Sequence, residues 1–433
     1  MVEYGELALR EAAKYRGKIQ VLPKVPIRAL KDFAVWYTPG VAALSRAVHE
    51  DSDLSFEYTW RWNAVAIVTD GSRVLGLGNI GPEAALPVME GKALLFKYLG
   101  GVDAIPLPVA TQDPEELVRV VRLMEPAFGG VNLEDIASPK CFYVLERLRA
   151  EASIPVWHDD QQGTAGAVLA ALLNALKVVG KRLSDVTIAL VGAGAANVAV
   201  ANVLMRAGAR AGQMFVVDSK GILHLERPDI EGLKRRNPWK YRLAVATNEE
   251  GRRGGIREAL RGADVVIAAS RPGPGVIRKE WVREMSDDPV VFALANPVPE
   301  IWPWEAKEAG ARVVATGRSD FPNQVNNSLV FPSVFRGALD VRSRAITDGM
   351  IIAAAEELAR FAEERGLSED YVIPRMTEWE VYPRVAAAVA VKACEEGVAR
   401  KPTTWSEELH RAQEVIGATR KALDALMRQG LIG

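Results

Sequence analysis

The stretch "VTIALVGAGAAN", residues 186–197, decides the fold of this 433-residue chain. It opens with a continuous apolar run, which is typical of a strand buried on both faces of a parallel sheet. A glycine-rich turn and a helix-like segment follow, and the next strand-like run, "QMFVVD", ends in Asp218. A Rossmann fold places an acid at this position, beside the ribose of a bound dinucleotide. Strand, turn, helix, strand and acid together predict a dinucleotide-binding unit.

The residues of this turn are typical of a phosphate-binding site. Gly192 permits the tight turn, and Gly194 lets the backbone approach a pyrophosphate at the helix N-terminus, where Ala195 and Ala196 follow. Asn197 stands where the motif usually has its third glycine, and we expect it to loosen the contact between helix and strand without removing the phosphate-binding amides. A plain structural turn is the alternative.

A second glycine stretch, "GLGNIG" at residues 76–81, matches the G-x-G-x-x-G pattern letter for letter but has the wrong context. It follows the second arm of a predicted hairpin, "AVAIVTDGSRVLGLG", and not the first strand of a parallel unit. Asp103 precedes the next strand-like run, "AIPLPV", and so cannot end it. We interpret this stretch as a flexible loop that enters a helix and can line a ligand cleft.

Strand-like and helix-like runs alternate along most of the chain, which indicates an α/β fold with largely parallel sheets. The length exceeds that of one ordinary core. We predict an N-terminal α/β substrate and metal domain at residues 1–161, a Rossmann-type doubly wound domain at residues 162–388, and a helical C-terminal tail at residues 389–433.

The bulk properties argue against several classes of partner. The formal net charge of −1 favours neither nucleic acid nor an anionic membrane. The most apolar helix-like segment, residues 163–180, is too short to span a bilayer, and the N-terminus lacks an apolar signal core. Two cysteines make neither a disulfide framework nor a zinc site. We expect a soluble cytoplasmic protein.

Two pairs of acidic residues follow strand-like runs: Glu134 and Asp135 after "GGVNL", and Asp159 and Asp160 after "SIPVWH". Parallel strands joined by a helical crossover bring their carboxyl ends to one sheet edge, so the four carboxylates should converge. Neighbouring strand residues point to opposite faces, so the chain must leave strand geometry for Glu134 and Asp135 to share an ion. Carboxylates alone suit Mg²⁺ or Mn²⁺ and not zinc. Solvated acids near helix N-termini are the alternative.

Three other positions carry local predictions. The helix after the first acid pair is expected to have Ser138 as its N-cap and Pro139 as its first residue. Lys92 lies in a helix-like stretch broken by Gly91; it either extends its stem to solvent or is desolvated, with a pKa depressed towards roughly 7–8 as a catalytic base requires. Tyr37 precedes a Thr-Pro-Gly turn and is either a packed aromatic or a positioned hydroxyl.

Taken together, these stretches resemble the malic enzymes, in their compact prokaryotic form, from about residue 30 to about residue 390. Two departures are Asn197 for the usual glycine and Gln162 where prokaryotic relatives often have histidine. The segments that carry the resemblance are "WYTPGVA", "VLGLGNIGPEAALPVMEGKALLFKYLGGVDAIPLPV", "NLEDIASP", "IPVWHDDQQGTA", "VGAGAAN", "VVDSKG", "ALANPVPEI" and "TGRSDFPNQVNNSLVFPSVFRGALD".

The resemblance implies a role for each matching residue. Tyr37 matches the general acid and Lys92 the general base, with Asp159 beside the metal ligands. The implied metal ligands are Glu134, Asp135 and Asp160; the implied cofactor contacts are Gly192, Gly194, Ala195, Ala196, Asp218 and Asn296; and the implied substrate contacts are Arg73, Lys92, Asn296, Asn326 and Asn327.

The implied activity is metal-dependent oxidative decarboxylation of (S)-malate to pyruvate and CO₂, with reduction of NAD or NADP. The family also implies a homo-oligomer, a dimer or a tetramer, and leaves open whether a neighbouring subunit completes the site. Asp218 favours NAD, whereas Lys220 is placed to pair with the 2′-phosphate of NADP, so both cofactors stay open. The alternatives are a dehydrogenase for another 2-hydroxy acid and a catalytically silent regulatory relative.

Overall fold

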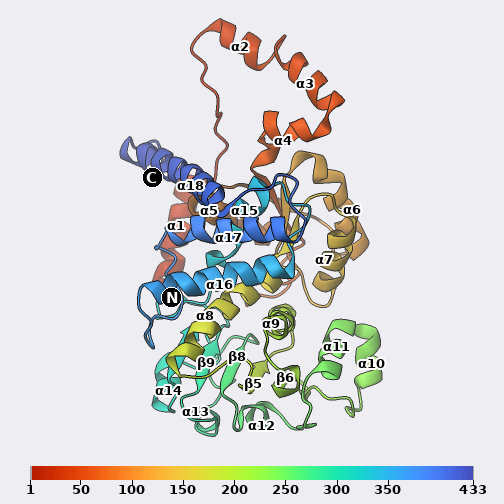
Figure 1. Ribbon diagram of the computed structural model, residues 1–433, viewed down its shortest axis with the longest axis vertical. Coiled ribbons are helices and arrows are strands. Elements are labelled where there is room, and N and C mark those ends of the chain that lie inside the picture. Colours follow the sequence, from red (N-terminus) through yellow and green to blue (C-terminus); the bar gives the residue numbers. More distant parts are fainter. Residues whose placement is uncertain (1, 433) are drawn as a thin grey trace.

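The computed structural model describes residues 2–432, with side chains described from Tyr4 onward. Two largely parallel sheets are stacked along the long axis of the molecule, with helices around and between them (Figure 1). The predicted α/β class with a Rossmann-type sheet is confirmed.

The first sheet has four parallel strands in the order β2-β1-β3-β4. All six residues of β1 are buried, because the strand is paired on both edges and covered on both faces. Its elements are β1 (Ala64–Thr69), α5 (Pro82–Gly100), β2 (Asp103–Pro108), α6 (Pro114–Met124), β3 (Gly130–Leu133), α7 (Lys140–Glu151) and β4 (Val156–His158).

The second sheet has six strands in the order β10-β9-β8-β5-β6-β7, and only β7 is antiparallel. The order reverses at β5, which pairs with β6 on one side and β8 on the other, and ligands of open α/β sheets bind at such a point. Its elements are β5 (Ile188–Val191), α9 (Ala195–Arg206), β6 (Met214–Asp218), β7 (Gly221–Ile222), α10 (Ile230–Arg236), α11 (Pro238–Ala246), α12 (Ile256–Leu260), β8 (Val265–Ala268), α13 (Lys279–Val282), β9 (Val290–Ala293), α14 (Pro303–Glu308) and β10 (Val313–Thr316).

Further α-helices and short 3₁₀ or π turns complete the fold. The α-helices are α1 (Val2–Tyr15), α2 (Leu30–Trp36), α3 (Val41–Glu50), α4 (Ser55–Tyr58), α8 (Thr164–Val178), α15 (Phe331–Asp340), α16 (Asp348–Glu364), α17 (Val381–Glu395) and α18 (Trp405–Arg428). The 3₁₀ turns are η1 (Ser52–Leu54), η2 (Trp60–Trp62), η3 (Glu125–Ala127), η5 (Ala211–Gln213) and η6 (Asn327–Leu329), and η4 (Asp159–Gly163) is a π-helical turn.

Three local predictions are wrong. The expected hairpin does not form, because β1 uses both edges for β2 and β3 and leaves only a bridge between Val74 and Gly78. Helix α5 runs unbroken through Gly91, since tertiary packing overrides the propensity of one glycine. Helix α7 begins at Lys140 with Pro139 before it and no side-chain cap, so Ser138 is not the N-cap.

The helices that follow the second sheet return to the first. The Phe96 ring of α5 lies 4.5 Å from the Phe331 ring and 5.3 Å from the Phe335 ring, measured between centroids, and both partners belong to α15. In Figure 1, α15, α17 and α18 lie beside α5. The predicted boundaries at residues 161 and 388 stay a prediction.

A buried ion pair anchors this return. The fully buried Arg336 of α15 donates from Nε and Nη2 to the carboxylate of Asp340, at 2.7 and 2.6 Å. Its Nη1 donates to Oδ1 of Asn63, the residue before β1, at 2.5 Å. Because each buried charge has its partner, this contact can join the C-terminal helices to the first sheet.

The N-terminal arm, residues 19–50, behaves differently. Helices α2 and α3 project beyond both sheets at the top of Figure 1, and neither contains a buried residue. The exposed side chains include Phe33, Val35 and Trp36. Over the part of the chain that the structure describes, we find no helix with the length and apolar character that crossing a bilayer requires.

We predict that Arg336→Met lowers the free energy of unfolding by about 3–5 kcal/mol, because it leaves Asp340 as an unpaired buried charge. Urea denaturation followed by tryptophan fluorescence measures this. Arg206→Met, which removes an exposed arginine paired with Asp348, should cost less than about 1 kcal/mol. Equal losses for the two variants would contradict the anchoring role.

Candidate active site

Acidic side chains gather where β3 and β4 end. Glu134 and Asp135 follow β3, and Asp160 lies in η4, directly after β4. One carboxylate oxygen from each of the three lies within 4.8 Å of the other two. The structure therefore brings these three predicted residues together, as the parallel crossover requires.

The chain leaves strand geometry at this point, as predicted. Asp135 has a φ of 55°, in the left-handed region that few non-glycine residues adopt. Its backbone N–H donates to Oδ2 of Asp160 at 2.9 Å, which ties the two loops together. Such a turn is what allows neighbours in the sequence to present carboxylates to one place.

Lys92 lies within this cluster. It is buried on α5, with Nζ 3.0 Å from Oε1 of Glu134, in a close ion pair with Asp159 and 4.4 Å from the centroid of the Phe331 ring. Burial lowers the pKa of Lys92, but the charges of Asp159 and Glu134 outweigh it and hold this pKa above its ordinary value. The alternative of a stem extended to solvent is wrong, and so is the expected depression towards neutral pH, because two carboxylates flank the ammonium.

Asp159 lies outside the carboxylate triplet. Its side chain is fully buried and pairs with Lys92, while its Oδ1 accepts a hydrogen bond from Nε1 of Trp157 at 2.9 Å. Trp157 was not among the predicted site residues, although strand alternation places it on the same face as Asp159. Nor was Asn132, whose Nδ2 donates to Oε2 of Glu134 at 2.9 Å.

The triplet fits a divalent cation. Within residues 2–432, the buried Oδ2 of Asp135 has no hydrogen-bond partner, and an orphaned carboxylate oxygen suits a ligand. Burial and the neighbouring charge of Asp160 raise the pKa of Asp135 to about 8, and burial also raises the pKa of Glu134. Asp160 remains partly exposed, so the site is open to solvent. An oxygen-only ligand set suits Mg²⁺ or Mn²⁺.

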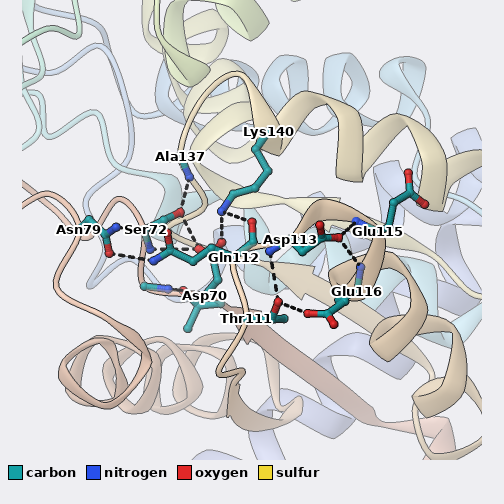
Figure 2. A network of polar contacts seen from close by, with 12 residues as sticks. Asp70, Ser72, Asn79, Thr111, Gln112, Asp113, Glu115, Glu116, Ala137 and Lys140 are labelled. Atoms are coloured by element: carbon teal, nitrogen blue, oxygen red, sulfur yellow. Dashed lines mark hydrogen bonds and ion pairs between the residues drawn. The ribbon is translucent and has the colours of Figure 1, made fainter.

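A polar network fixes the loop that carries Arg73 (Figure 2). The buried carboxylate of Asp70 accepts hydrogen bonds from the backbone N–H and the hydroxyl of Ser72, at 3.0 and 2.6 Å, and forms a close ion pair with Lys140. The Ser72 hydroxyl in turn accepts from the backbone N–H of Ala137 at 2.9 Å.

Arg73 follows this network directly. Its backbone N–H donates to the carbonyl of Asp135 at 2.9 Å, and its side chain is exposed. The turn at Asp70 therefore positions an arginine and a metal-ligand candidate against each other. A positioned arginine beside a cation site can hold a substrate carboxylate.

The glycine turn after β5 has the geometry of a phosphate site. Gly192 has a φ of 99°, and a Cβ there would lie 2.5 Å from the carbonyl of Ala269. Around Gly194 the space is open, since a Cβ there would meet no described atom within 4 Å. Helix α9 begins at Ala195 without a side-chain cap, which leaves its first amides for an anion.

Asn197 tightens the contact between α9 and the second sheet, which the sequence predicted it would loosen. It is fully buried, and its Nδ2 donates to the carbonyls of Val191, Gly192 and Ile267 at 2.9, 3.0 and 3.3 Å. The predicted loosening is wrong, because the amide ties α9 to both β5 and β8. A glycine packs there by its small size, whereas this asparagine packs there by hydrogen bonding.

The loop at residues 76–81 enters α5, as interpreted from the sequence. A Cβ on Gly76 would lie 3.0 Å from Cγ of Pro272 and 3.2 Å from the carbonyl of Asn296. The loop therefore contacts the second sheet's loops, on the side where Asn296 lies. It borders the predicted cofactor region without being the nucleotide turn.

The three asparagines lie on loops between the sheets. Nδ2 of Asn296 is 2.7 Å from the place a Cβ on Gly317 would take, and Nδ2 of Asn326 donates to the Gly317 carbonyl at 3.4 Å. Asn327 lies against η4, because its Cβ is 3.0 Å from the position that a Cβ on Gly163 would take. Of the three, Asn327 is the one that contacts the turn that carries Asp160.

Tyr37, the predicted general acid, is not brought to this cluster by the chain itself. It lies between α2 and α3 on the projecting arm, and its side chain is 73% exposed. The packed-aromatic alternative is wrong for the isolated chain.

Comparisons with known proteins agree over most of the chain. The family model described as malic enzyme, N-terminal domain matches residues 16–149, and that of the malic enzyme, NAD binding domain matches residues 161–396. The chain is 50% identical to the bifunctional malic/malolactic enzyme of Bacillus subtilis, over 91% of this chain and 95% of that protein. It is 47% identical to the NAD-dependent malic enzyme of Geobacillus stearothermophilus, over 89% and 78%. The crystal structure of Entamoeba histolytica malic enzyme superposes with a TM-score of 0.96 at 46% identity, covering 99% of this chain and 89% of that one.

We predict that Lys140→Met weakens Mn²⁺ binding about tenfold, because the Asp70 turn then no longer holds the loop of Asp135. A Mn²⁺ titration followed by electron paramagnetic resonance measures this without turnover. Lys177→Met, which removes an exposed lysine paired with Glu363, is the control and should leave the titration unchanged. A structural role alone would lower thermal stability but leave the Mn²⁺ titration as in the wild type.

Proposed function

This chain belongs to the malic enzyme family, and we propose that it oxidises (S)-malate with NAD(P)⁺ and releases CO₂ to leave pyruvate. The family resemblance found in its motifs is thereby confirmed. The observation that carries the proposal is the buried ammonium of Lys92 in one cluster with three convergent carboxylates. A base beside a divalent-cation site is what this chemistry requires.

We assign the cation to Glu134, Asp135 and Asp160. Their convergence and the orphaned oxygen of Asp135 support this assignment. Asp159 instead holds Lys92 in place. Arg73, fixed against Asp135, is assigned to a carboxylate of malate.

We assign the dinucleotide to the carboxyl edge of the second sheet. Asp218 at the end of β6 lies next to the glycine turn that follows β5 at Gly192. The asparagines are assigned to the nicotinamide end and to malate, because Asn296 and Asn326 both lie against Gly317, next to β10, and Asn327 lies against η4. The pyrophosphate contacts are Gly192, Gly194, Ala195 and Ala196, and the asparagines are Asn296, Asn326 and Asn327.

The residues of this chain divide the proton chemistry. A dinucleotide bound at the second sheet would supply the hydride acceptor for carbon 2, and a cation held by Glu134, Asp135 and Asp160 would supply the positive charge that polarises the oxygen on that carbon. Lys92 is assigned to take the proton of the 2-hydroxyl, and for this the charge of a cation beside Glu134 would have to offset the carboxylates that hold the pKa of Lys92 high. Asp159 and Glu134 would then stabilise the ammonium that it becomes. Tyr37 donates a proton to carbon 3 of the enolpyruvate that remains after loss of CO₂.

The exposure of Tyr37 bears on the oligomeric state. We propose a homodimer, alone or within a tetramer, in which the arm of one subunit reaches the cluster of the other. The exposed apolar side chains of Phe33, Val35 and Trp36 give that arm a surface to bury. In this assembly the partner subunit's Tyr37 serves Lys92.

We also propose a cytoplasmic location. Cys141 and Cys394 are both free, as expected in a reducing compartment.

A screen of malate, lactate, tartrate and isocitrate with each cofactor separates the proposed activity from that of another 2-hydroxy acid dehydrogenase. Binding of malate without turnover of any substrate would instead support a regulatory relative.

We predict that Lys92→Ala lowers kcat for malate oxidation by roughly 10²–10⁴-fold, because it removes the amine that lies 3.0 Å from Glu134 and is assigned as the base. Initial rates measured by NAD(P)H absorbance test this. Lys97→Ala on the same helix removes a half-exposed lysine and is the matched control. Turnover at the wild-type rate would exclude Lys92 as the base.

We predict that Asp160→Asn, or removal of divalent ions with EDTA, abolishes malate turnover, since the cation loses a charged ligand. Added Mn²⁺ should restore the EDTA-treated wild type but not the variant at the same concentration. Rates unchanged by EDTA after exhaustive dialysis would show that the acids hold no catalytic cation.

We predict that mixing inactive Tyr37→Phe and Lys92→Ala enzymes restores about a quarter of the wild-type activity, because half of the randomly formed dimers then carry one intact site. Two affinity tags isolate the hybrid and show that exchange has occurred. A purified hybrid without activity, or a monomeric wild type by light scattering, would contradict the shared site.

A further inference from the structure

The carboxylate of Asp218, the acid at the end of β6, is already occupied by other groups of the chain. Its side chain is 9% exposed. Oδ1 accepts from the backbone N–H of Lys220 at 2.9 Å and from Nη1 of Arg227 at 3.0 Å, and Oδ2 accepts from Nζ of Lys240 at 3.3 Å. Both oxygens therefore have charged or polar partners before any ligand arrives.

This acid lies at the predicted adenosine end of the dinucleotide. In the register of β5 and β6, Val191 is opposite Val217, so Gly192 and Asp218 are the next pair along the two strands. The backbone N–H of Gly192 donates to the Val217 carbonyl at 2.9 Å. In a Rossmann fold, a free acid here binds the ribose hydroxyls of NAD and repels the 2′-phosphate of NADP.

The surrounding charges favour an anion. Three cations, Lys220, Arg227 and Lys240, face two acids, Asp218 and Asp229, so three minus two leaves a local charge of +1. A free acid at the end of β6 would instead leave a local negative charge, which repels an anion.

The cations differ in mobility. Arg227 is 5% exposed and holds Asp229 with Nε and Nη2, at 3.0 and 3.1 Å, which fixes its guanidinium. The side chains of Lys220 and Lys240 are 59% and 19% exposed, each held by a single ion pair. These two ammonium groups are the ones that can turn towards a ligand.

We propose that the adenosine end of this site is built for a 2′-phosphate, so that the chain binds NADP⁺ more tightly than NAD⁺. Lys220 and Lys240 contact the phosphate, and Asp218 holds the basic groups in place instead of excluding the anion. The inference rests on the proposed function for the identity of the site, and it concerns which dinucleotide that site selects.

The test uses two nucleotides that differ only in the 2′-phosphate, namely 5′-AMP and adenosine 2′,5′-bisphosphate. Isothermal titration calorimetry of the full-length protein at low ionic strength should show the bisphosphate bound about tenfold more tightly, as charge-assisted hydrogen bonds provide. Lys220→Met and Lys240→Met should each remove most of that preference and change the affinity for 5′-AMP by less than about twofold.

Lys307→Met is the matched control. It removes one positive charge from α14, which packs on the edge strand β10 at the opposite side of the sheet, and should leave the preference unchanged. Equal or tighter binding of 5′-AMP, or lysine variants that keep the wild-type preference, would overturn the inference. Failure of both nucleotides to bind would overturn it together with the dinucleotide site. Preferential binding of the bisphosphate without malate turnover would support it while contradicting the proposed reaction.

Discussion

The ion pairs of Lys92 with Glu134 and Asp159 are the interactions on which the candidate site depends. They join α5, the end of β3 and the start of η4 in a place that solvent barely reaches. A buried ammonium without partners would be costly, and so would two unpaired carboxylates, so the three elements are stable only together. Trp157 and Asn132 each bond one of these carboxylates, which limits how far the cluster can relax.

The same logic recurs around the cluster. The buried Asp70 is matched by Lys140 and Ser72, and the loop that it fixes bonds Asp135 through the backbone of Arg73. At the second sheet, Asn197 satisfies three carbonyls from one buried amide. Asp70 and Asn197 are buried where they set the position of a neighbouring strand or loop, and partners of each come from a different element.

The projecting arm differs from the rest of the chain because its apolar side chains remain exposed. Helices α2 and α3 bury no side chain, although the arm carries phenylalanine, valine, tryptophan and tyrosine. An apolar segment of this kind costs conformational entropy to order and gains no burial within the chain. The proposed dimer would bury it against a second copy, whose carboxylate cluster is partly open to solvent at Asp160.

Local patterns in the sequence determined the classes of structure and most of the site. Apolar runs ending in acids predicted parallel strands, and the shared direction of those strands then required Glu134, Asp135, Asp159 and Asp160 to lie at one edge. Tertiary structure alone decided what depends on neighbours distant in sequence. In place of the expected hairpin, β1 pairs with β2 and β3. Two carboxylates raise the pKa of Lys92, and the buried amide of Asn197 joins α9 to β5 and β8 by hydrogen bonds. Tertiary structure also placed Tyr37 on an exposed arm, because the packing of that arm depends on a surface that no pattern within the arm specifies.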